Sequence, residues 1–228
     1  MARVLRTIVA CGLACAAGCA GAEHGATSGA SPAVARFDFE KGALGSTPVG
    51  FSSARTGEGP LGNWVLVDGD GGRGRVLAQT DADATDARYP LCVAEDVVAR
   101  DVRAGVHFQA RSGEVDQAAG VVVRFRDENT YYMARANALE SNVRFYSVVD
   151  GVRKQLASAR VSVTGQAWHE LVLEARGSRF RVDYDGATLL DVVDATIPGA
   201  GKAGLWTKAD SVTWFDDFAI ESLDAAGS

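Results

Sequence analysis

Apolar and polar residues alternate with a period of two along most of the chain after about residue 33. The clearest stretch is 117–151, which holds three apolar runs at 121–126, 131–137 and 143–149. The first two runs are separated by Asp127-Glu128-Asn129, a sequence typical of a turn. Alternation bounded by turn residues is typical of β-strands, so we expect three successive strands in this stretch.

The same pattern continues through the rest of the chain. It predicts further strands at 36–40, 63–68, 75–80, 101–110, 153–163, 168–175, 178–184, 187–193, 201–208 and 212–222. Asp185-Gly186 is the strongest local signal for a tight hairpin. No window of a dozen residues shows an amphipathic helical stripe. Many short strands, with turns between them and no helices, predict an all-β antiparallel sandwich.

Composition narrows the class of protein. The chain has 228 residues, of which 47% are hydrophobic, so it can bury the core of one domain. Its formal net charge of −6 argues against nucleic-acid binding, because neutralising phosphates requires a basic surface. The same charge disfavours docking of the folded surface on anionic lipid. We therefore expect no nucleic-acid partner.

The first 19 residues have the features of a bacterial secretory signal. Two arginines precede an apolar run at 7–18 that is too short to span a membrane. The segment ends in Ala16-Ala17-Gly18-Cys19, which resembles the lipobox of bacterial lipoproteins and predicts acylation of Cys19. An ordinary cleaved signal peptide is the alternative. Ala20 after the cysteine favours a lipid anchor in the outer membrane rather than the inner membrane, and that lipid would be the only membrane contact.

Residues 20–32 are small and polar, which is typical of a flexible tether, and 33–228 are expected to form a single domain. Cys92 is the one cysteine of that domain, so a disulfide within it is excluded. Its apolar neighbours indicate a buried small hydrophobic residue rather than a nucleophile.

Two longer blocks resemble a known family. They are VDQAAGVVVRFRDENTYYMARANALESNVRFYSV and GKAGLWTKADSVTWFDDF. They are similar to signature segments of bacterial secreted proteins with a concanavalin A-like (laminin G-like) fold, a family often described as 3-keto-disaccharide hydrolase or family 16 glycoside hydrolase-like. The resemblance covers about 37–220 and implies a two-sheet jelly roll whose concave face binds glycans in many relatives. One fold of this kind hosts lectins, binding modules and hydrolases, so it does not choose among them.

Several side chains in these blocks are suited to holding a polar ligand. Guanidinium, carboxylate and amide groups can form the paired hydrogen bonds that sugar hydroxyls use, and an aromatic ring of Tyr132, Trp168 or Trp206 can provide a stacking face. The alternative is structural, because an Arg between strands often pairs with a Glu and an Asn at a corner often satisfies turn backbone. The candidate ligand-binding residues are Arg124, Tyr132, Arg135, Asn137, Glu140, Asn142, Trp206 and Lys208.

A glycosidase mechanism finds little support in the sequence. Retaining glycosidases place two carboxylates close together, and laminarinase-type jelly rolls carry them in a Glu-x-Asp-x-x-Glu pattern. Glu114 and Asp116 match only its first half, so a loop capped by two acids is the better interpretation. We assign no catalytic residue. If the protein is an enzyme, the family implies a hydrolase or a lyase that acts on 3-keto-glycosides. Glu140 is then the first acid or base to test.

The resemblance also suggests a structural calcium ion. Phe37-Asp38-Phe39-Glu40 and Phe215-Asp216-Asp217-Phe218 resemble the paired first and last strands of jelly-roll binding modules, which often share calcium. Glu40 and Asp217 are the candidate ligands, since calcium prefers oxygen donors. The alternative is that both acids simply face solvent.

Together these patterns favour a lipid-anchored carbohydrate-recognition jelly roll of the cell envelope that is not an enzyme. The alternatives are the hydrolase or lyase and a structural or protein-interaction module. Convergent polar residues with an exposed aromatic residue would favour carbohydrate recognition or the enzyme. A concave face filled by its own side chains would favour the structural or protein-interaction module.

Overall fold

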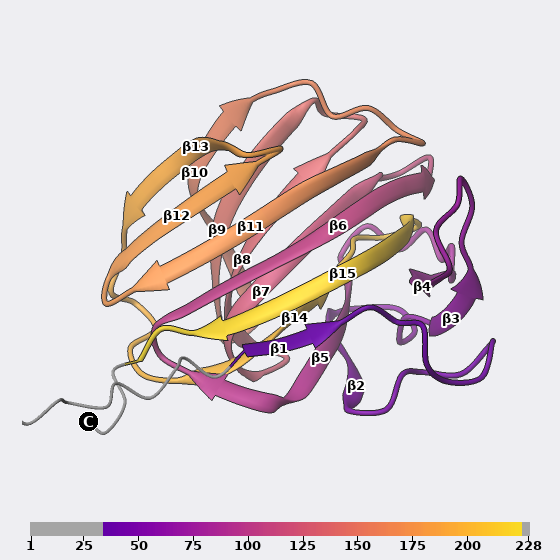
Figure 1. Cartoon of the computed structure of the whole chain (residues 1–228). Coiled ribbons are helices and arrows are strands. Elements are labelled where there is room, and N and C mark those ends of the chain that lie inside the picture. The colour runs from indigo at the N-terminus through magenta and orange to yellow at the C-terminus, as the bar shows by residue number, and fades with distance from the viewer. Residues whose placement is uncertain (1–33, 225–228) are drawn as a thin grey trace, which may run out of the picture. The chain divides into compact units, whose positions relative to one another are not determined.

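The computed structural model describes residues 34–224, which form fifteen β-strands and no helix (Figure 1). The strands form two sheets, and every pair within them is antiparallel. The jelly-roll sandwich predicted from the alternation and the family resemblance is therefore confirmed. No helix within the described range is long and apolar enough to cross a membrane.

Sheet A lies in front in Figure 1 and sheet B behind it. Sheet A contains, in spatial order, β13 (Ala187–Val193), β12 (Arg179–Tyr184), β11 (Trp168–Arg176), β6 (Val102–Ser112), β15 (Val212–Ser222), β4 (Arg75–Gln79) and β3 (Trp64–Asp68), and β1 (Val34–Phe37) also pairs with β15. Sheet B contains, in spatial order, β10 (Val152–Arg160), β9 (Asn142–Val149), β8 (Thr130–Asn137), β7 (Ala118–Asp127), β14 (Gly201–Trp206), β5 (Arg88–Ala99) and β2 (Phe51–Gly57).

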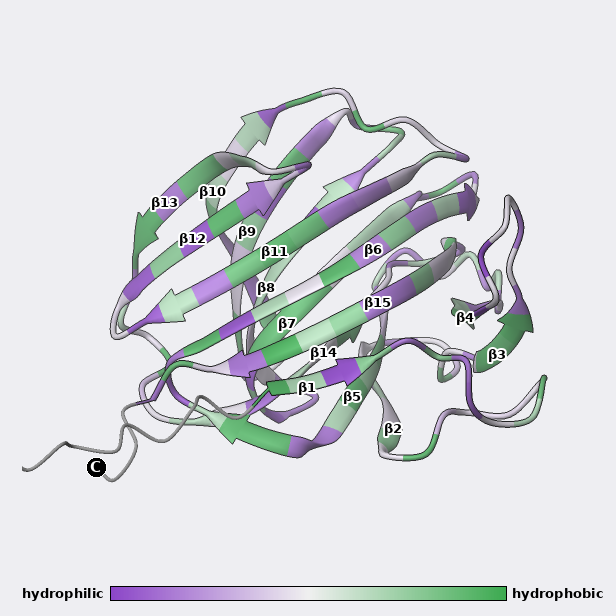
Figure 2. Cartoon of the chain, in the orientation of Figure 1, coloured by the Kyte–Doolittle hydropathy of each residue, from purple (hydrophilic) through white to green (hydrophobic). Residues whose placement is uncertain are grey.

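The main core fills the space between the sheets. Along β6, β11 and β12 hydrophobic and hydrophilic residues alternate (Figure 2), so each strand turns one face inward. Phe108 and Leu171 of sheet A belong to the same buried cluster as Val121, Ala134 and Phe145 of sheet B. Burial of these side chains is the main force holding the two layers together.

Sheet B curls around its outer face, the face turned away from sheet A. The guanidinium of Arg153 on edge strand β10 lies 4.7 Å from the ring centre of Tyr89 on β5, although four strands separate them in the sheet. The hydroxyl groups of Thr56 on β2 and Tyr131 on β8 are 2.8 Å apart. In a flat sheet five strand spacings would span about 24 Å. These contacts therefore require the outer face of sheet B to be concave.

The strand predictions hold for thirteen elements, and two strands were missed. β2 reads FSSARTG and has polar residues at most positions, which is typical of a loop. β5 has a proline near its start, and a proline argues against a strand when only the sequence is known. The predicted signal peptide, the tether and acylated Cys19 lie outside the described residues.

The hairpin predicted at Asp185-Gly186 is confirmed. Both residues have positive φ, at 46° and 76°, as a two-residue type I′ turn requires. Cys92 is fully buried on β5, as expected for a small hydrophobic residue.

Candidate functional site

Polar side chains gather at one end of the concave face of sheet B. Because successive residues of a strand point to opposite sides, Arg135 and Asn137 on β8 face outward while Ala134 and Ala136 point into the core. On β9 the same rule places Asn142 on the outer side, and it pairs in register with Asn137. Alternation along the sequence predicts the shared face of Arg135 and Asn137, but it places Asn142 at the corner that follows.

Arg135 is the centre of this group. Its Nη1 donates to Asn142 Oδ1 at 2.6 Å, and its Nη2 donates to Glu140 Oε2 at 2.7 Å. Arg144 on β9 lies beside Arg135 in register, and its Nη1 is 3.0 Å from the same carboxylate oxygen. One oxygen of Glu140 therefore receives two guanidinium groups, while among the described residues no donor reaches Oε1.

These contacts set the ionisation of Glu140. Burial alone would raise the pKa of its carboxyl group, but the hydrogen bonds from Arg135 and Asn142 and the charges of Arg135 and Arg144 outweigh burial and hold the pKa below its usual value. Glu140 is therefore a carboxylate at neutral pH, which suits an acceptor of hydrogen bonds better than an acid catalyst.

A buried carboxyl group completes the polar end. Asn137 donates a hydrogen bond from Nδ2 to Asp116, and Lys208 Nζ lies 3.1 Å from Asp116 Oδ2 and 2.5 Å from Asp86. Burial raises the pKa of Asp116, although the charges of Lys208 and Arg135 offset part of the rise. Lys208 thus lies next to Asp116 at this end of the face.

The loop that carries Asp116 is held by Asp210. Its carboxylate accepts the backbone N–H groups of Glu114, Val115 and Asp116 at 2.6–3.1 Å. The sequence interpretation treated Glu114 and Asp116 as equivalent loop acids. Only Asp116 turns into the site, where it is 3% exposed.

The centre of the concave face is filled by the protein's own apolar side chains. Trp206 is fully buried there, together with Met133 and Leu91. Its ring stacks on Tyr89 with ring centres 5.8 Å apart. The predicted role of Trp206 as an exposed stacking platform is therefore wrong, because the curl of the sheet covers it.

Arg153 lies at the surface of this apolar region. Its guanidinium is 4.7 Å from the ring centre of Tyr89 and 4.8 Å from that of Tyr146. Tyr146 in turn has its hydroxyl group 3.5 Å from Arg144 Nη1. Arg153 thus lies over the ring of Tyr146, and Arg144 lies beside the hydroxyl group of the same residue.

Two predicted ligand-binding residues have structural roles instead. Tyr132 is fully buried between the sheets, where its ring packs on Phe145 and Phe180 and its hydroxyl donates to Asp194. Arg124 has a φ of 51° at an irregularity in β7. Its guanidinium donates to the backbone carbonyls of Arg100, Ile197 and Gly177.

Both predicted calcium ligands contact nitrogen atoms of the chain. Glu40 Oε2 accepts the backbone N–H of Arg75 at 3.2 Å. Asp217 lies 3.3 Å from Arg73 and 3.4 Å from His107. Within residues 34–224 no group of three or more His, Cys, Asp or Glu side chains is arranged to hold a metal ion. The positive charge of Arg73 beside Asp217 disfavours a cation there, and the calcium site at Glu40 and Asp217 stays a prediction.

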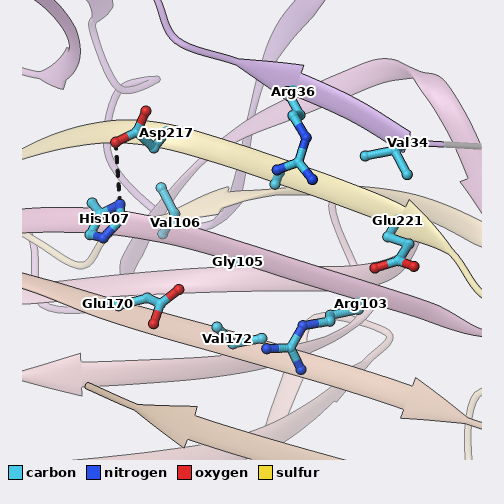
Figure 3. Close-up of a pocket in the computed structure, with 11 residues that line it drawn as sticks. Val34, Arg36, Arg103, Gly105, Val106, His107, Glu170, Val172, Asp217 and Glu221 are labelled. Atoms are coloured by element: carbon cyan, nitrogen blue, oxygen red, sulfur yellow. Dashed lines mark ion pairs between the residues drawn. The ribbon is translucent and has the colours of Figure 1, made fainter. Parts of the chain in front are cut away.

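Sheet A carries a hollow of about 370 Å³ on its own outer face (Figure 3). Its floor contains Gly105 and Val172, and charged side chains surround it (Figure 3). Arg36 points toward the middle from β1, and Glu170 lies on the β11 side (Figure 3). Among the described residues that line this hollow there is no Phe, Tyr or Trp. It differs in this respect from the concave face of sheet B.

Next to the hollow, five residues form what we name the sheet A clasp: Asp70, Arg73, Arg111, Trp168 and Trp214. The Arg73 guanidinium lies 4.1 Å from the Trp168 ring centre, and that of Arg111 lies 4.0 Å from the Trp214 ring centre. Asp70 pairs with Arg111 at 2.6 Å. Asp70 and Arg73 both come from the glycine-rich connection between β3 and β4, which the clasp holds against the sheet.

The sequence analysis missed three side chains of the site. Alternation along 143–149 places Arg144 and Tyr146 on the side opposite Val143 and Phe145, so their shared face could have been found. Arg153 gave no such signal, because the curl that brings β10 over β5 depends on contacts between distant strands.

Comparison with known proteins identifies the fold but no family. No protein-family model matches the chain, and no curated protein matches its sequence. The carbohydrate-binding module CBM66 from Bacillus subtilis superposes with a TM-score of 0.60 and 19% identity, covering 76% of this chain and 96% of that module.

Two further solved structures agree. The Ca2+/Man-bound exoplasmic/lumenal domain of VIP36 gives a TM-score of 0.57 at 10% identity, covering 78% of this chain and 85% of that domain. A Bacillus subtilis protein of unknown function with a galectin-like fold gives 0.56 at 10% identity, covering 85% and 97%. Identities this low show the jelly-roll fold alone. The 3-keto-disaccharide hydrolase family stays a prediction.

Proposed function

We propose that the concave face of sheet B binds carbohydrate. The observation that carries the proposal is the convergence of Arg135, Asn137, Glu140, Asn142 and Lys208 at one end of a curled sheet. The fold similarity to a carbohydrate-binding module and to the mannose-bound VIP36 domain supports it as an analogy.

Binding would use the groups that the protein leaves unsatisfied. Glu140 Oε2 is occupied by Arg135 and Arg144, whereas no donor of the described residues contacts Oε1, which can accept a sugar hydroxyl. The side chains of Glu140 and Arg144 are 41% and 30% exposed, so both can reach a ligand. Arg135 is almost fully buried and would orient Glu140 rather than contact the ligand broadly.

The second candidate function is that of a hydrolase or lyase that cleaves a glycoside. It is favoured by one observation: Asn137 links two carboxyl-bearing residues, since its Nδ2 donates to Asp116 and its Oδ1 accepts the backbone N–H of Glu140. Asp116 has a raised pKa and Glu140 a lowered one. Such a pair can divide the roles of acid and base. Asp116 is buried beneath Asn137 and Lys208, which limits its access to a substrate, so binding is the preferred proposal.

The proposal places the protein in the cell envelope, anchored through acylated Cys19 by the tether at 20–32. The filled centre of the concave face leaves a third function, protein interaction, as an outcome of the test below.

The test is a glycan-array screen and a 3-keto-disaccharide turnover assay on the purified full-length chain. We expect binding without turnover, weakened in Glu140→Gln and in Arg144→Ala. Arg181→Ala is the matched control, since Arg181 lies on sheet A and pairs with Asp183 at 2.9 Å. Thermal unfolding of each variant checks that the fold is kept.

Two results would contradict the proposal. Turnover that disappears in Glu140→Gln would make the protein an enzyme. The absence of both binding and turnover across a broad panel would move the function to protein interaction.

A further inference from the structure

We propose that the carbohydrate bound by sheet B is acidic, a glycan with carboxylate groups such as uronic acid residues, and that Arg153 and Arg144 hold those groups. The inference rests on the proposed function and specifies the class of ligand.

The first argument is the pairing of the positive charges on this face. Arg135 is matched by Glu140 at 2.7 Å, and Lys208 is matched by Asp86 and Asp116. Arg144 shares the Glu140 oxygen that Arg135 already occupies. The face thus holds four cations, counting Arg153, but only three carboxylates pair with them among the described residues.

Arg153 is the unmatched cation. Within the part of the chain that the structure describes, its guanidinium forms no ion pair or hydrogen bond. It is instead held between the rings of Tyr89 and Tyr146. Stacking on aromatic faces stabilises the positive charge and fixes the plane of the guanidinium while leaving its N–H edges free.

A planar guanidinium with free edges is a receptor for a carboxylate. Arginine can bind both oxygens of a carboxylate through two parallel hydrogen bonds, which are stronger than bonds between neutral groups. A neutral sugar would leave the charge of Arg153 uncompensated in a half-buried position. This local excess of positive charge also stands out in a chain with a formal net charge of −6.

Arg144 provides a second contact at a useful spacing. Its Nη1 lies 3.5 Å from the hydroxyl of Tyr146, and the ring of the same tyrosine supports Arg153. Both guanidinium groups therefore contact the same tyrosine side chain. A chain of uronic acid residues can present carboxylates to both.

The experiment is isothermal titration calorimetry of the full-length chain with oligogalacturonate and oligoalginate, each beside its carboxyl-reduced counterpart. We expect the acidic oligosaccharides to bind and the reduced ones to bind with an affinity lower by a factor of about ten or more. A hydrogen bond to a charged group contributes roughly one such factor to affinity. Arg153→Ala should weaken acidic binding by a similar factor, and added salt should weaken it further.

Arg153→Lys sharpens the test. It keeps the charge but loses the planar group, so it should recover only part of the affinity. Arg181→Ala should leave binding unchanged. Equal binding of the acidic and reduced oligosaccharides, or unchanged affinity in Arg153→Ala, would overturn the inference while the proposed function stands. Binding of sulfated oligosaccharides but of neither uronate would also overturn it. If the wild-type protein binds none of these oligosaccharides, acidic or reduced, the proposed function is overturned as well.

Discussion

The two outer faces of the sandwich both stack arginines on aromatic rings, but they neutralise those arginines differently. In the sheet A clasp Arg111 pairs with Asp70, and Arg73 pairs with Asp216 next to β6. On sheet B, Arg153 lies over two tyrosines with no carboxylate partner among the described residues. A stack that the chain neutralises itself acts as an internal tie, whereas an unneutralised stack is free to receive an external anion.

The faces also differ in what lies beneath the arginines. Trp168 and Trp214 are half-buried on sheet A, while Trp206 is completely buried on sheet B by the curl of that sheet. The concave face thus combines a rigid apolar base with a charged opening. The following predictions would break or sharpen this comparison, from the largest effect to the smallest.

Trp206→Ala should be the most damaging substitution. Removing a fully buried aromatic side chain lowers the free energy of unfolding by about 3–5 kcal/mol. Trp214→Ala is the matched change on sheet A and should cost clearly less, since Trp214 is only half-buried. Urea denaturation of both variants measures the difference. Equal losses would show that the two faces are equally buried and would remove this contrast.

Asp210→Asn should destabilise the loop that carries Asp116. The carboxylate of Asp210 accepts three backbone N–H groups, and weakening them should lower the free energy of unfolding by about 1–3 kcal/mol. Chemical denaturation at neutral pH measures this loss. A stability equal to that of the wild type would mean that the loop is held by other contacts.

The same residue gives a pH dependence. Burial alone would raise the pKa of Asp210, but the amide hydrogen bonds of Glu114, Val115 and Asp116 outweigh it and lower the pKa. A lowered pKa in the folded state stabilises the protein at pH values above the usual pKa of an Asp carboxyl group. This stabilisation is lost as the pH falls through the folded-state pKa. The wild type should therefore lose more stability on acidification than Asp210→Asn, as thermal unfolding across acidic pH would show. Parallel pH profiles would contradict this assignment.

Arg73→Ala should loosen the sheet A clasp. Loss of the cation–π contact lowers the free energy of unfolding by about 0.5–2 kcal/mol and uncovers Trp168. Quenching of tryptophan fluorescence by acrylamide should increase. Arg153→Ala is the matched change on sheet B and should alter neither quenching nor stability as much, because Arg153 forms no ion pair within residues 34–224. The reverse order would mean that Arg153 is the internal tie.

Cys92 offers the smallest and simplest test. Burial raises the pKa of its thiol, so Cys92 should not react with a thiol reagent in the native protein. It should react on unfolding, and this would report the opening of sheet B at β5. Rapid reaction in native buffer would show that β5 is accessible from the core side.

The sequence was sufficient for the fold class because the alternation of apolar residues is local information. It also placed Arg135 and Asn137 on one face, since parity along a strand is counted from the sequence, but it put Asn142 in the following corner rather than on β9. The same count applied strictly would have separated Tyr132 from Arg135, which are three positions apart and point to opposite sides. Tyr132 was grouped with Arg135 as a ligand-binding residue because the polar composition of the segment was given more weight than its periodicity.

Other features depend on geometry that no local pattern contains. The irregularity in β7 turns Arg124 into the interior, and its positive φ is not favoured by an arginine. The curl of sheet B buries Trp206 and brings Arg153 over Tyr89, and it results from contacts between strands far apart in the sequence.

The pairing of β1 with β15 makes the fold suitable for rewiring. Val34 lies opposite Glu221 in that antiparallel pair, so the two ends of the described sandwich are neighbours on sheet A. A short linker could join them, and a new break in the chain could be opened at the exposed Asp150-Gly151 turn between β9 and β10. Such a circular permutant would keep every strand pair but turn β10, with Arg153, into the first strand of the chain. A reporter or a second domain could then be fused at the edge strand that carries Arg153.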